Sequence, residues 1–260
     1  MSVDTSSTRS RISAGFGTVP YFVAAGLLIF VGIYVATPWL VARRVPLLFA
    51  ITGSLFLPIV VVFAAALVVY QRGGGDWRWP AFRDRFRLQW PTRREWLLFL
   101  TAGLLVLAVE ALLEPVSVWV ATIVPLPLPA VLPPLLDPLT PVDVPPSAFM
   151  GMPLAGNLWI VPFWILAFVV NIAGEELLWR GYLLPRQEAV FGRWAWLLNG
   201  ILWAYVVHAF MWWNFVTLLP TSLVTPYLAQ RYETTWAGIT VHGLGNAIWV
   251  VVLAASVIQG

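Results

Sequence analysis

Residues 171–182 read NIAGEELLWRGY and place two adjacent glutamates, Glu175 and Glu176, inside a long apolar run. A carboxylate at the centre of a membrane helix costs roughly 2.5–3.5 kcal/mol on insertion scales. Charged groups at such positions commonly face the protein interior and carry function. These two residues are therefore the first candidates for a functional site.

The composition around this stretch is that of a membrane protein. Of the 260 residues, 60% are hydrophobic and 10% are charged, whereas soluble domains average about a quarter charged residues. The absence of cysteine excludes disulfides and thiolate metal sites. The basic residues are 15 arginines without a lysine, a usage typical of GC-rich bacterial genomes, so we expect a multi-pass protein of a bacterial inner membrane.

The apolar runs predict an all-α bundle of about seven transmembrane helices, since about 20 apolar residues span a bilayer. Proline is expected to kink the second span at Pro58 and to break the sixth at Pro220 and Pro226. The ten prolines of residues 125–156 predict an extended outer loop. The expected spans are residues 19–41, 46–70, 96–124, 158–184, 194–213, 215–230 and 236–258.

The arginines indicate how this bundle is oriented. With seven spans, twelve arginines fall on the side of the amino terminus, and only Arg43 and Arg44 fall in loops on the other side. The positive-inside rule then places the amino terminus in the cytoplasm and the carboxyl terminus outside. Residues 71–95 interleave seven of these arginines with aromatic residues. Such a pattern can bind nucleic acid, but between two spans we favour a cytoplasmic loop on anionic lipid headgroups and expect no nucleic acid.

A second pair of glutamates, Glu110 and Glu114, lies one helical turn apart in the third span. They can serve the site, pair with polar groups inside the bundle or approach the far interface. We favour a structural role.

The fourth span contains a local ion pair. Glu176 precedes Arg180 by four residues, the favourable order for a pair on one helix face. Glu175 points about 100° away from Glu176 and is left without this partner. Two carboxyls in different environments are typical of general acid–base chemistry.

The only two histidines, His208 and His242, lie in the fifth and seventh spans. Asn246 lies one turn after His242, and Gly243 and Gly245 are expected to allow a close approach of helices. A single buried His or Asn is commonly an interhelical hydrogen-bonding residue. Together with the glutamates, however, this set can activate a water molecule and stabilise an oxyanion.

Three motifs resemble signatures of the CAAX prenyl protease and bacteriocin-processing family, also called CPBP or ABI. Residues 175–181, EELLWRG, resemble its EExxxR signature, and residues 242–246, HGLGN, resemble its HxxxN signature. Residues 191–195, FGRWA, followed by His208, resemble the lead into its FxxxH signature. The resemblance covers roughly residues 157–250, with the motifs in the right order.

The second motif departs from the family pattern. Ala204 stands four residues before His208, where the family has an aromatic residue. Trp203 is offset by one position and is expected to point elsewhere on an α-helix.

The resemblance implies an intramembrane endopeptidase that hydrolyses a peptide bond of a membrane-associated protein or peptide, in contact with membrane lipids. Glu175 would be the general base, with Glu176 beside it and positioned by Arg180. His208 would assist in activating water. The oxyanion donors would be His242 and Asn246.

The resemblance also divides the chain. The expected segments are a disordered polar tail at 1–17, three accessory helices at 18–124 that include the Arg/Trp-rich loop 71–95, the proline-rich loop 125–156, and a CPBP-like catalytic bundle at 157–260.

Three alternatives stay open. A catalytically silent relative would act as a membrane scaffold or as an immunity or partner protein. A transporter would use intramembrane Glu and His to relay protons, although the inverted repeats typical of transporters are not evident. Finally, two histidines and a carboxylate can hold a divalent ion such as zinc. The zincin pattern HExxH is absent, so we expect metal-free glutamate chemistry without a cofactor.

Overall fold

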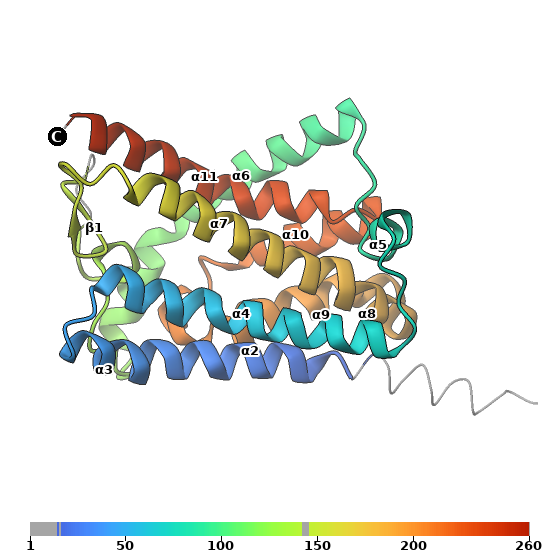
Figure 1. Cartoon of the computed structure of the whole chain (residues 1–260), viewed down its shortest axis with the longest axis horizontal. Coiled ribbons are helices and arrows are strands. Elements are labelled where there is room, and N and C mark those ends of the chain that lie inside the picture. The colour runs from blue at the N-terminus through green and yellow to red at the C-terminus, as the bar shows by residue number, and fades with distance from the viewer. Residues whose placement is uncertain (1–14, 16, 142–145, 260) are drawn as a thin grey trace, which may run out of the picture.

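The computed structural model describes residues 15, 17–141 and 146–259. Residues 1–14 and 16, which make up most of the tail predicted to be disordered, lie outside the described residues. The described residues form a bundle of long helices with one two-stranded hairpin (Figure 1). The predicted fold class, an all-α membrane bundle, is confirmed.

Two antiparallel helical segments at the start of the chain pack against each other. The first is continuous from α2 (Val19–Val31) through the π-helical η1 (Gly32–Ala36) to α3 (Thr37–Ala42), and α4 (Leu47–Arg72) returns beside it. A buried hydrogen bond of 2.8 Å joins the hydroxyls of Thr37 and Ser54 between them. Pro58 is buried inside α4 and does not end it.

The Arg/Trp-rich loop folds onto the bundle instead of only lying on lipid headgroups. It contains α5 (Trp79–Arg85) and leads into α6 (Arg93–Ile123), which begins with a capping box between Thr92 and Glu95. Phe86 is fully buried, and its carbonyl accepts a 2.6 Å hydrogen bond from the Thr235 hydroxyl. The loop is thereby held against the beginning of the last helix.

The described residues of the proline-rich segment have little regular structure. A 3₁₀ turn, η2 (Pro134–Leu136), precedes a hairpin of β1 (Ala148–Phe149) and β2 (Met152–Pro153), which pair antiparallel. Residues 142–145 of this loop lie outside the described residues.

The carboxyl-terminal part of the chain contains the predicted motifs. Two π-helical segments, η3 (Leu177–Leu183) and η5 (Trp203–Val207), interrupt its helices. The other elements are α7 (Ile160–Glu176), α8 (Leu184–Phe191), η4 (Gly192–Trp194), α9 (Ala195–Leu202), η6 (Ala209–Asn214), α10 (Leu219–Tyr232) and α11 (Trp236–Gln259).

Among the described residues, five helical segments are long and apolar enough to cross a membrane. Most of the predicted fourth and fifth spans falls within the fourth of these segments, which turns at Gly192, where φ is +54°. With 14 residues, α10 is shorter than the others, so the count of about seven stays a prediction. The five segments are Val19–Ala42, Leu47–Arg72, Arg93–Ile123, Ile160–Val207 and Trp236–Ile258.

Two expectations about the helix boundaries are wrong. The helix of the fifth span does not run to residue 213; it ends at Val207, and His208 is its C-cap. Pro220 and Pro226 do not break α10, because Pro220 lies in the first turn, where a missing N–H is tolerated, and the helix continues through Pro226.

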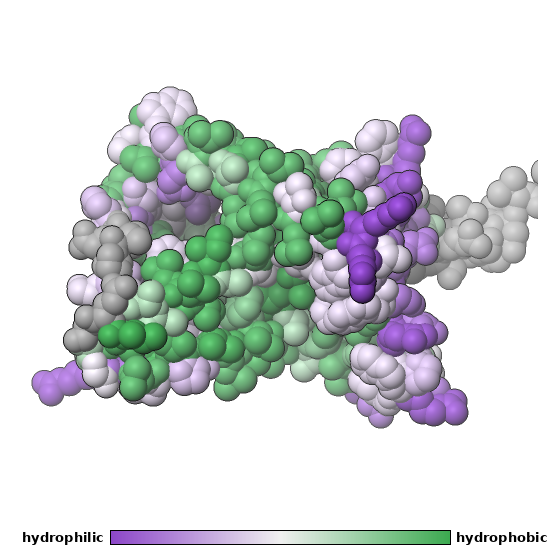
Figure 2. Space-filling model, turned by 90° about the horizontal axis from the view of Figure 1, so that it is seen from above, coloured by the Kyte–Doolittle hydropathy of each residue, from purple (hydrophilic) through white to green (hydrophobic). Residues whose placement is uncertain are grey.

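The surface has the layout of a membrane protein. Figure 2 shows an apolar band across the middle of the molecule and hydrophilic residues concentrated at the end that carries α5 in Figure 1. Large apolar side chains of different spans are exposed, including Leu27, Leu57, Leu104, Leu112 and Val251. Inside the bundle, α7 packs against α4 and α11, and η5 packs against α2.

Candidate active site

The two glutamates of the opening stretch are buried at the end of α7. Glu175 is 5% exposed, and Glu176 and Arg180 are 0% exposed. Arg180 Nη1 donates a hydrogen bond of 3.1 Å to Glu176 Oε1. The predicted pairing of Glu176 with the arginine one turn later is therefore present, and it joins two fully buried charges.

His242 of α11 completes this ion pair. Its Nδ1 lies 2.9 Å from the same Glu176 oxygen, Oε1. The close approach depends on Gly238, because a Cβ there would collide with Glu176 Oε2. The sequence pointed instead to Gly243 and Gly245. A Cβ at Gly243 would make only ordinary contacts, and one at Gly245 would lie 3.0 Å from a leucine side chain of α6.

Glu175 is held by two tryptophans. Its Oε2 accepts hydrogen bonds from the indole N–H of Trp179 at 3.1 Å and of Trp203 at 2.7 Å. The sequence analysis did not include Trp179 in the site, although its position four residues after Glu175 puts both on one helix face. The two glutamates thus have different partners, as their different directions on the helix predicted.

The π-helical segment η5 explains how Trp203 reaches the site. The backbone N–H of His208 bonds to the carbonyl of Trp203, five residues earlier, at 3.3 Å. A π-turn brings residues i and i+5 together, and such turns are frequent at functional sites. The rings of Trp203 and His208 are 4.5 Å apart. The expectation that Trp203 points elsewhere is therefore wrong, since it assumed α-helical geometry.

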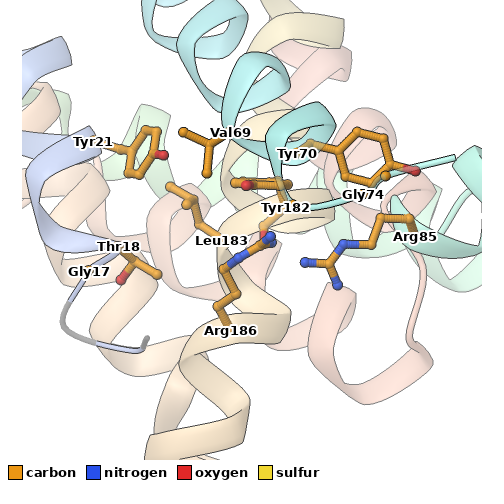
Figure 3. A pocket seen from close by; sticks show the side chains of 12 residues that line it. Gly17, Thr18, Tyr21, Val69, Tyr70, Gly74, Arg85, Tyr182, Leu183 and Arg186 are labelled. Carbon is orange, nitrogen blue, oxygen red and sulfur yellow. The ribbon is translucent and has the colours of Figure 1, made fainter. Parts of the chain in front are cut away.

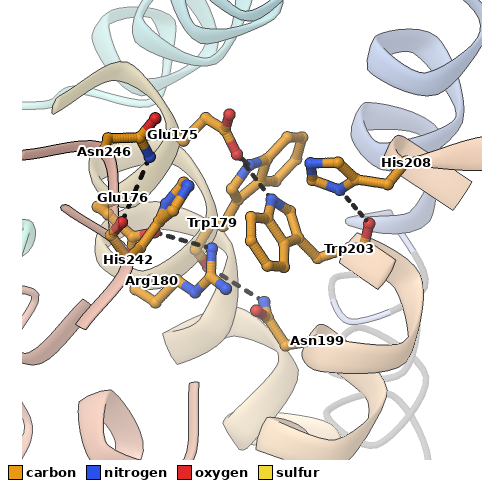
Figure 4. Close-up of polar contacts among 9 residues, drawn as sticks. All are labelled: Glu175, Glu176, Trp179, Arg180, Asn199, Trp203, His208, His242 and Asn246. Carbon is orange, nitrogen blue, oxygen red and sulfur yellow. Dashed lines mark hydrogen bonds and ion pairs between the residues drawn. The ribbon is translucent and has the colours of Figure 1, made fainter. Parts of the chain in front are cut away.

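Trp203 is the centre of the cluster. Its ring lies 5.0 Å from the ring of His242, and the Arg180 guanidinium carbon lies 4.7 Å from its centroid. Figure 4 shows Trp203 between His208 on one side and His242 with Arg180 on the other. The structure thus brings the two glutamates, Arg180 and both histidines around one indole ring.

The hydrogen bonds of the histidines determine which ring nitrogens face the site. His208 Nδ1 lies 2.9 Å from the carbonyl oxygen of Trp203, and His242 Nδ1 bonds to the Glu176 carboxylate. Both partners are acceptors, so Nδ1 carries the proton in each ring. The Nε2 atom of each ring is therefore the one available for acid–base chemistry.

Asn246 is near the cluster but is not bonded to its side chains. Its Nδ2 donates a long hydrogen bond of 3.4 Å to the backbone carbonyl of His242. An oxyanion contact by this amide would require the side chain to turn away from its own helix.

His208 also lines a cavity of about 200 Å³ together with Ala204, Tyr205 and Trp212. The small Ala204 side chain, which replaces the family's aromatic residue, therefore lies beside open space. The imidazole of His208 therefore borders this cavity.

A buried polar network supports the cluster from the side of α8. Asn199 Nδ2 donates to the carbonyl of Trp179 at 3.1 Å and to Gln187 Oε1 at 2.8 Å, and Gln187 Nε2 donates to Thr18 Oγ1 at 3.1 Å. All three polar side chains are buried. This network, which the sequence did not indicate, ties α9, α8 and the beginning of α2 together beside the motif.

The surroundings of the second glutamate pair, Glu110 and Glu114, favour a structural role. Glu110 Oε1 accepts hydrogen bonds from the backbone N–H of Thr221 at 3.1 Å and from its hydroxyl at 2.6 Å, in the first turn of α10. Glu114 is exposed and lines a cavity with the proline-rich loop. These two residues match the structural interpretation of the sequence.

Among the described residues, no three or more His, Cys, Asp or Glu side chains are grouped so that they could hold a metal ion. Metal dependence therefore stays a matter for experiment.

The comparisons with known proteins agree with the motifs. Residues 157–248 match a family model described as type II CAAX prenyl endopeptidase Rce1-like. The comparisons with curated proteins and with solved structures gave no match. The family match spans about a third of the chain and includes all the residues clustered around Trp203. The resemblance to the CAAX protease family is confirmed for residues 157–248, which match this Rce1-like endopeptidase domain.

Proposed function

We propose that this protein hydrolyses a peptide bond of a membrane-associated protein or peptide, using a water molecule activated by glutamate and histidine. The enzyme would act in a bacterial inner membrane. The observation that carries the proposal is the gathering of Glu175, His208 and His242 around Trp203. A scaffold would not need two carboxylates and two imidazoles in one buried place, where each desolvated charge is costly.

Glu175 is the proposed general base. Its Oε2 accepts hydrogen bonds from two indole N–H groups. Its other oxygen can then accept a proton from water. His208 Nε2 would orient the same water, because Nδ1 is fixed by the Trp203 carbonyl.

Glu176 is the proposed positioning residue for His242. It holds the imidazole through Nδ1 and is itself neutralised by Arg180. His242 would donate a hydrogen bond from Nε2 to a developing oxyanion. Asn246 would add its amide after turning from the His242 carbonyl. Removal of one such donor typically lowers the rate by about 100- to 1000-fold.

The test is cleavage of a membrane-tethered peptide library by the purified protein in detergent. Glu175→Gln keeps the size of the side chain but removes the base, so we expect cleavage to fall by about 100- to 10,000-fold. Glu110→Gln is the matched control, since it makes the same change in a half-buried carboxylate of another helix and should leave cleavage intact. Folding of both variants is checked by size-exclusion chromatography.

The alternatives give different results. Full biological activity of both Glu175→Gln and His242→Ala in the native host would favour the catalytically silent scaffold. Loss of cleavage in chelator with recovery in zinc would show metal dependence. Flux of a solute into liposomes, abolished by the same substitutions, would indicate a transporter.

A further inference from the structure

A cavity of about 450 Å³ lies at the arginine-rich end of the bundle, past the carboxylate cluster (Figure 3). Three segments form its walls: the beginning of α2, the end of α4 with its glycine turn, and the junction of η3 with α8. Arg85 of α5 completes the lining. No residue of the proposed catalytic set lines this cavity.

Two arginines, Arg85 and Arg186, are the charged residues of the lining, which contains no acidic residue. Arg186 stacks on Tyr182, with its guanidinium carbon 3.5 Å from the ring centroid, and its Nη1 donates to the Tyr182 carbonyl at 2.6 Å. The guanidinium carbon of Arg85 lies 5.6 Å from the same ring. Figure 3 shows both guanidinium groups converging beneath Tyr182.

Three neighbouring arginines, in contrast, form ion pairs with carboxylates. Arg78 pairs with Asp76, Arg83 with Asp84 and Arg87 with Glu188, and the bonds from Arg78 hold the pKa of Asp76 below its ordinary value. Within residues 15, 17–141 and 146–259, Arg85 and Arg186 have no carboxylate partner.

Convergence of these two cations favours an anion between them. The two like charges repel each other in their partly buried space. An anion bound between them would attract both and offset that repulsion. The contact of Arg186 with Tyr182 uses one nitrogen and one face of the guanidinium and leaves its other N–H groups free to donate.

We propose that this cavity binds a phosphate group. The planar fork of arginine matches phosphate oxygens in a bidentate way, and two such forks supply the donors that a phosphate needs. The Tyr21 side chain lies on the opposite wall and brings a hydroxyl to the same space. The group can belong to an anionic lipid headgroup or to a free phosphate, because this end of the molecule faces the leaflet that carries anionic lipids if the positive-inside rule holds. The site does not depend on the peptidase activity.

The test uses the full-length protein in detergent and follows its thermal unfolding. One series adds inorganic phosphate against sodium chloride of equal ionic strength. The other adds phosphatidylglycerol against diacylglycerol, which lacks the phosphate. We expect phosphatidylglycerol, phosphate or both to raise the Tm of the unsubstituted protein, and Arg85→Gln to weaken the apparent affinity by about 10-fold.

Arg83→Gln is the matched control, since it removes the same charge from α5 outside the cavity and should leave the affinity unchanged. A shift with phosphatidylglycerol alone assigns the site to a headgroup, and a shift with phosphate as well assigns it to free phosphate. Arg186→Gln should weaken binding at least as much as Arg85→Gln. If Arg186→Gln does not fold, the result for Arg85→Gln decides the question, because the Arg85 side chain makes no hydrogen bond within the described part of the chain. The proposal is overturned if neither probe shifts the Tm, or if Arg83→Gln weakens binding as much as Arg85→Gln.

Discussion

The membrane-spanning helices contain two pairs of glutamates that the sequence presents in a similar way and the structure treats differently. Glu175 and Glu176 of α7 are enclosed by indole N–H groups, a guanidinium and an imidazole. Glu110 of α6 instead accepts two hydrogen bonds from Thr221 at the beginning of α10, and Glu114 is exposed. In the first pair, Glu176 is bonded to a guanidinium and an imidazole. In the second pair, Glu110 is bonded to a hydroxyl and a backbone amide, and Glu114 is exposed to solvent.

This difference teaches that a carboxylate in a membrane-spanning helix does not by itself identify an active site. Glu110 stabilises a helix terminus, where negative charge is favoured by the helix dipole and by free N–H groups. Such a role requires an acceptor but no proton transfer. The surroundings of Glu175 and Glu176, in contrast, offer groups that can hold and exchange protons. Three predictions test the contrast, beginning with the largest effect.

Substitution of Arg180 by Met should destabilise the protein most. Removal of one partner of a fully buried pair typically costs about 3–5 kcal/mol, because the remaining charge is left buried without compensation. His242 would then be the remaining partner of Glu176. The measurement is thermal unfolding in detergent together with the yield of monodisperse protein.

The matched control is Arg87→Met. Arg87 makes a bidentate pair with Glu188, but these side chains are 18% and 20% exposed, so water can solvate the remaining charge. Its substitution should therefore lower the Tm clearly less than that of Arg180. An equal loss of Tm in the two variants would mean that the burial of the Glu176–Arg180 pair does not increase its contribution to stability.

Substitution of Trp203 by Phe should have an intermediate effect, on catalysis more than on stability. The ring is largely preserved, but the 2.7 Å bond to Glu175 is lost. Hydrogen bonds to charged groups contribute about 1.5–3 kcal/mol, which corresponds to roughly a 10- to 100-fold lower kcat. The measurement is the rate of peptide cleavage at saturating substrate.

Trp164→Phe is the control for this change. Trp164 is also buried, but its indole nitrogen has no hydrogen-bond partner among the described residues, so cleavage should be unchanged. A rate for Trp203→Phe equal to that of the unsubstituted protein would show that the bond to Glu175 does not contribute to catalysis.

Local rules predicted part of this arrangement from the sequence. Apolar length marks the helices, because a membrane span has a minimum number of residues. The pair of Glu176 with Arg180 follows from helix geometry, since residues four apart are neighbours whatever the fold. The same rule would have found Trp179, four residues after Glu175.

Other parts depend on contacts between distant segments and could not be predicted in this way. The π-turn that brings Trp203 over His208 adds one residue to a helical turn, and no pattern in the apolar periodicity revealed it. The approach of Gly238 to Glu176 joins residues of α11 and α7. The burial of Phe86, and its bond to Thr235, likewise join segments far apart in the chain. Spacing along one helix contains no information about such pairs.

The smallest effect is expected for Glu110→Gln, which distinguishes the two pairs most directly. The amide oxygen of Gln can still accept from the N–H and hydroxyl of Thr221, so only the charge is lost. Charge near a helix N-terminus contributes about 0.3–1 kcal/mol, and we expect a slightly lower Tm with normal cleavage. Glu110→Leu should lower the Tm further, because it leaves the buried Thr221 donors without their acceptor. A loss of cleavage in Glu110→Gln comparable to that in Glu175→Gln would instead place Glu110 in the proton-transfer path and remove the distinction between the pairs.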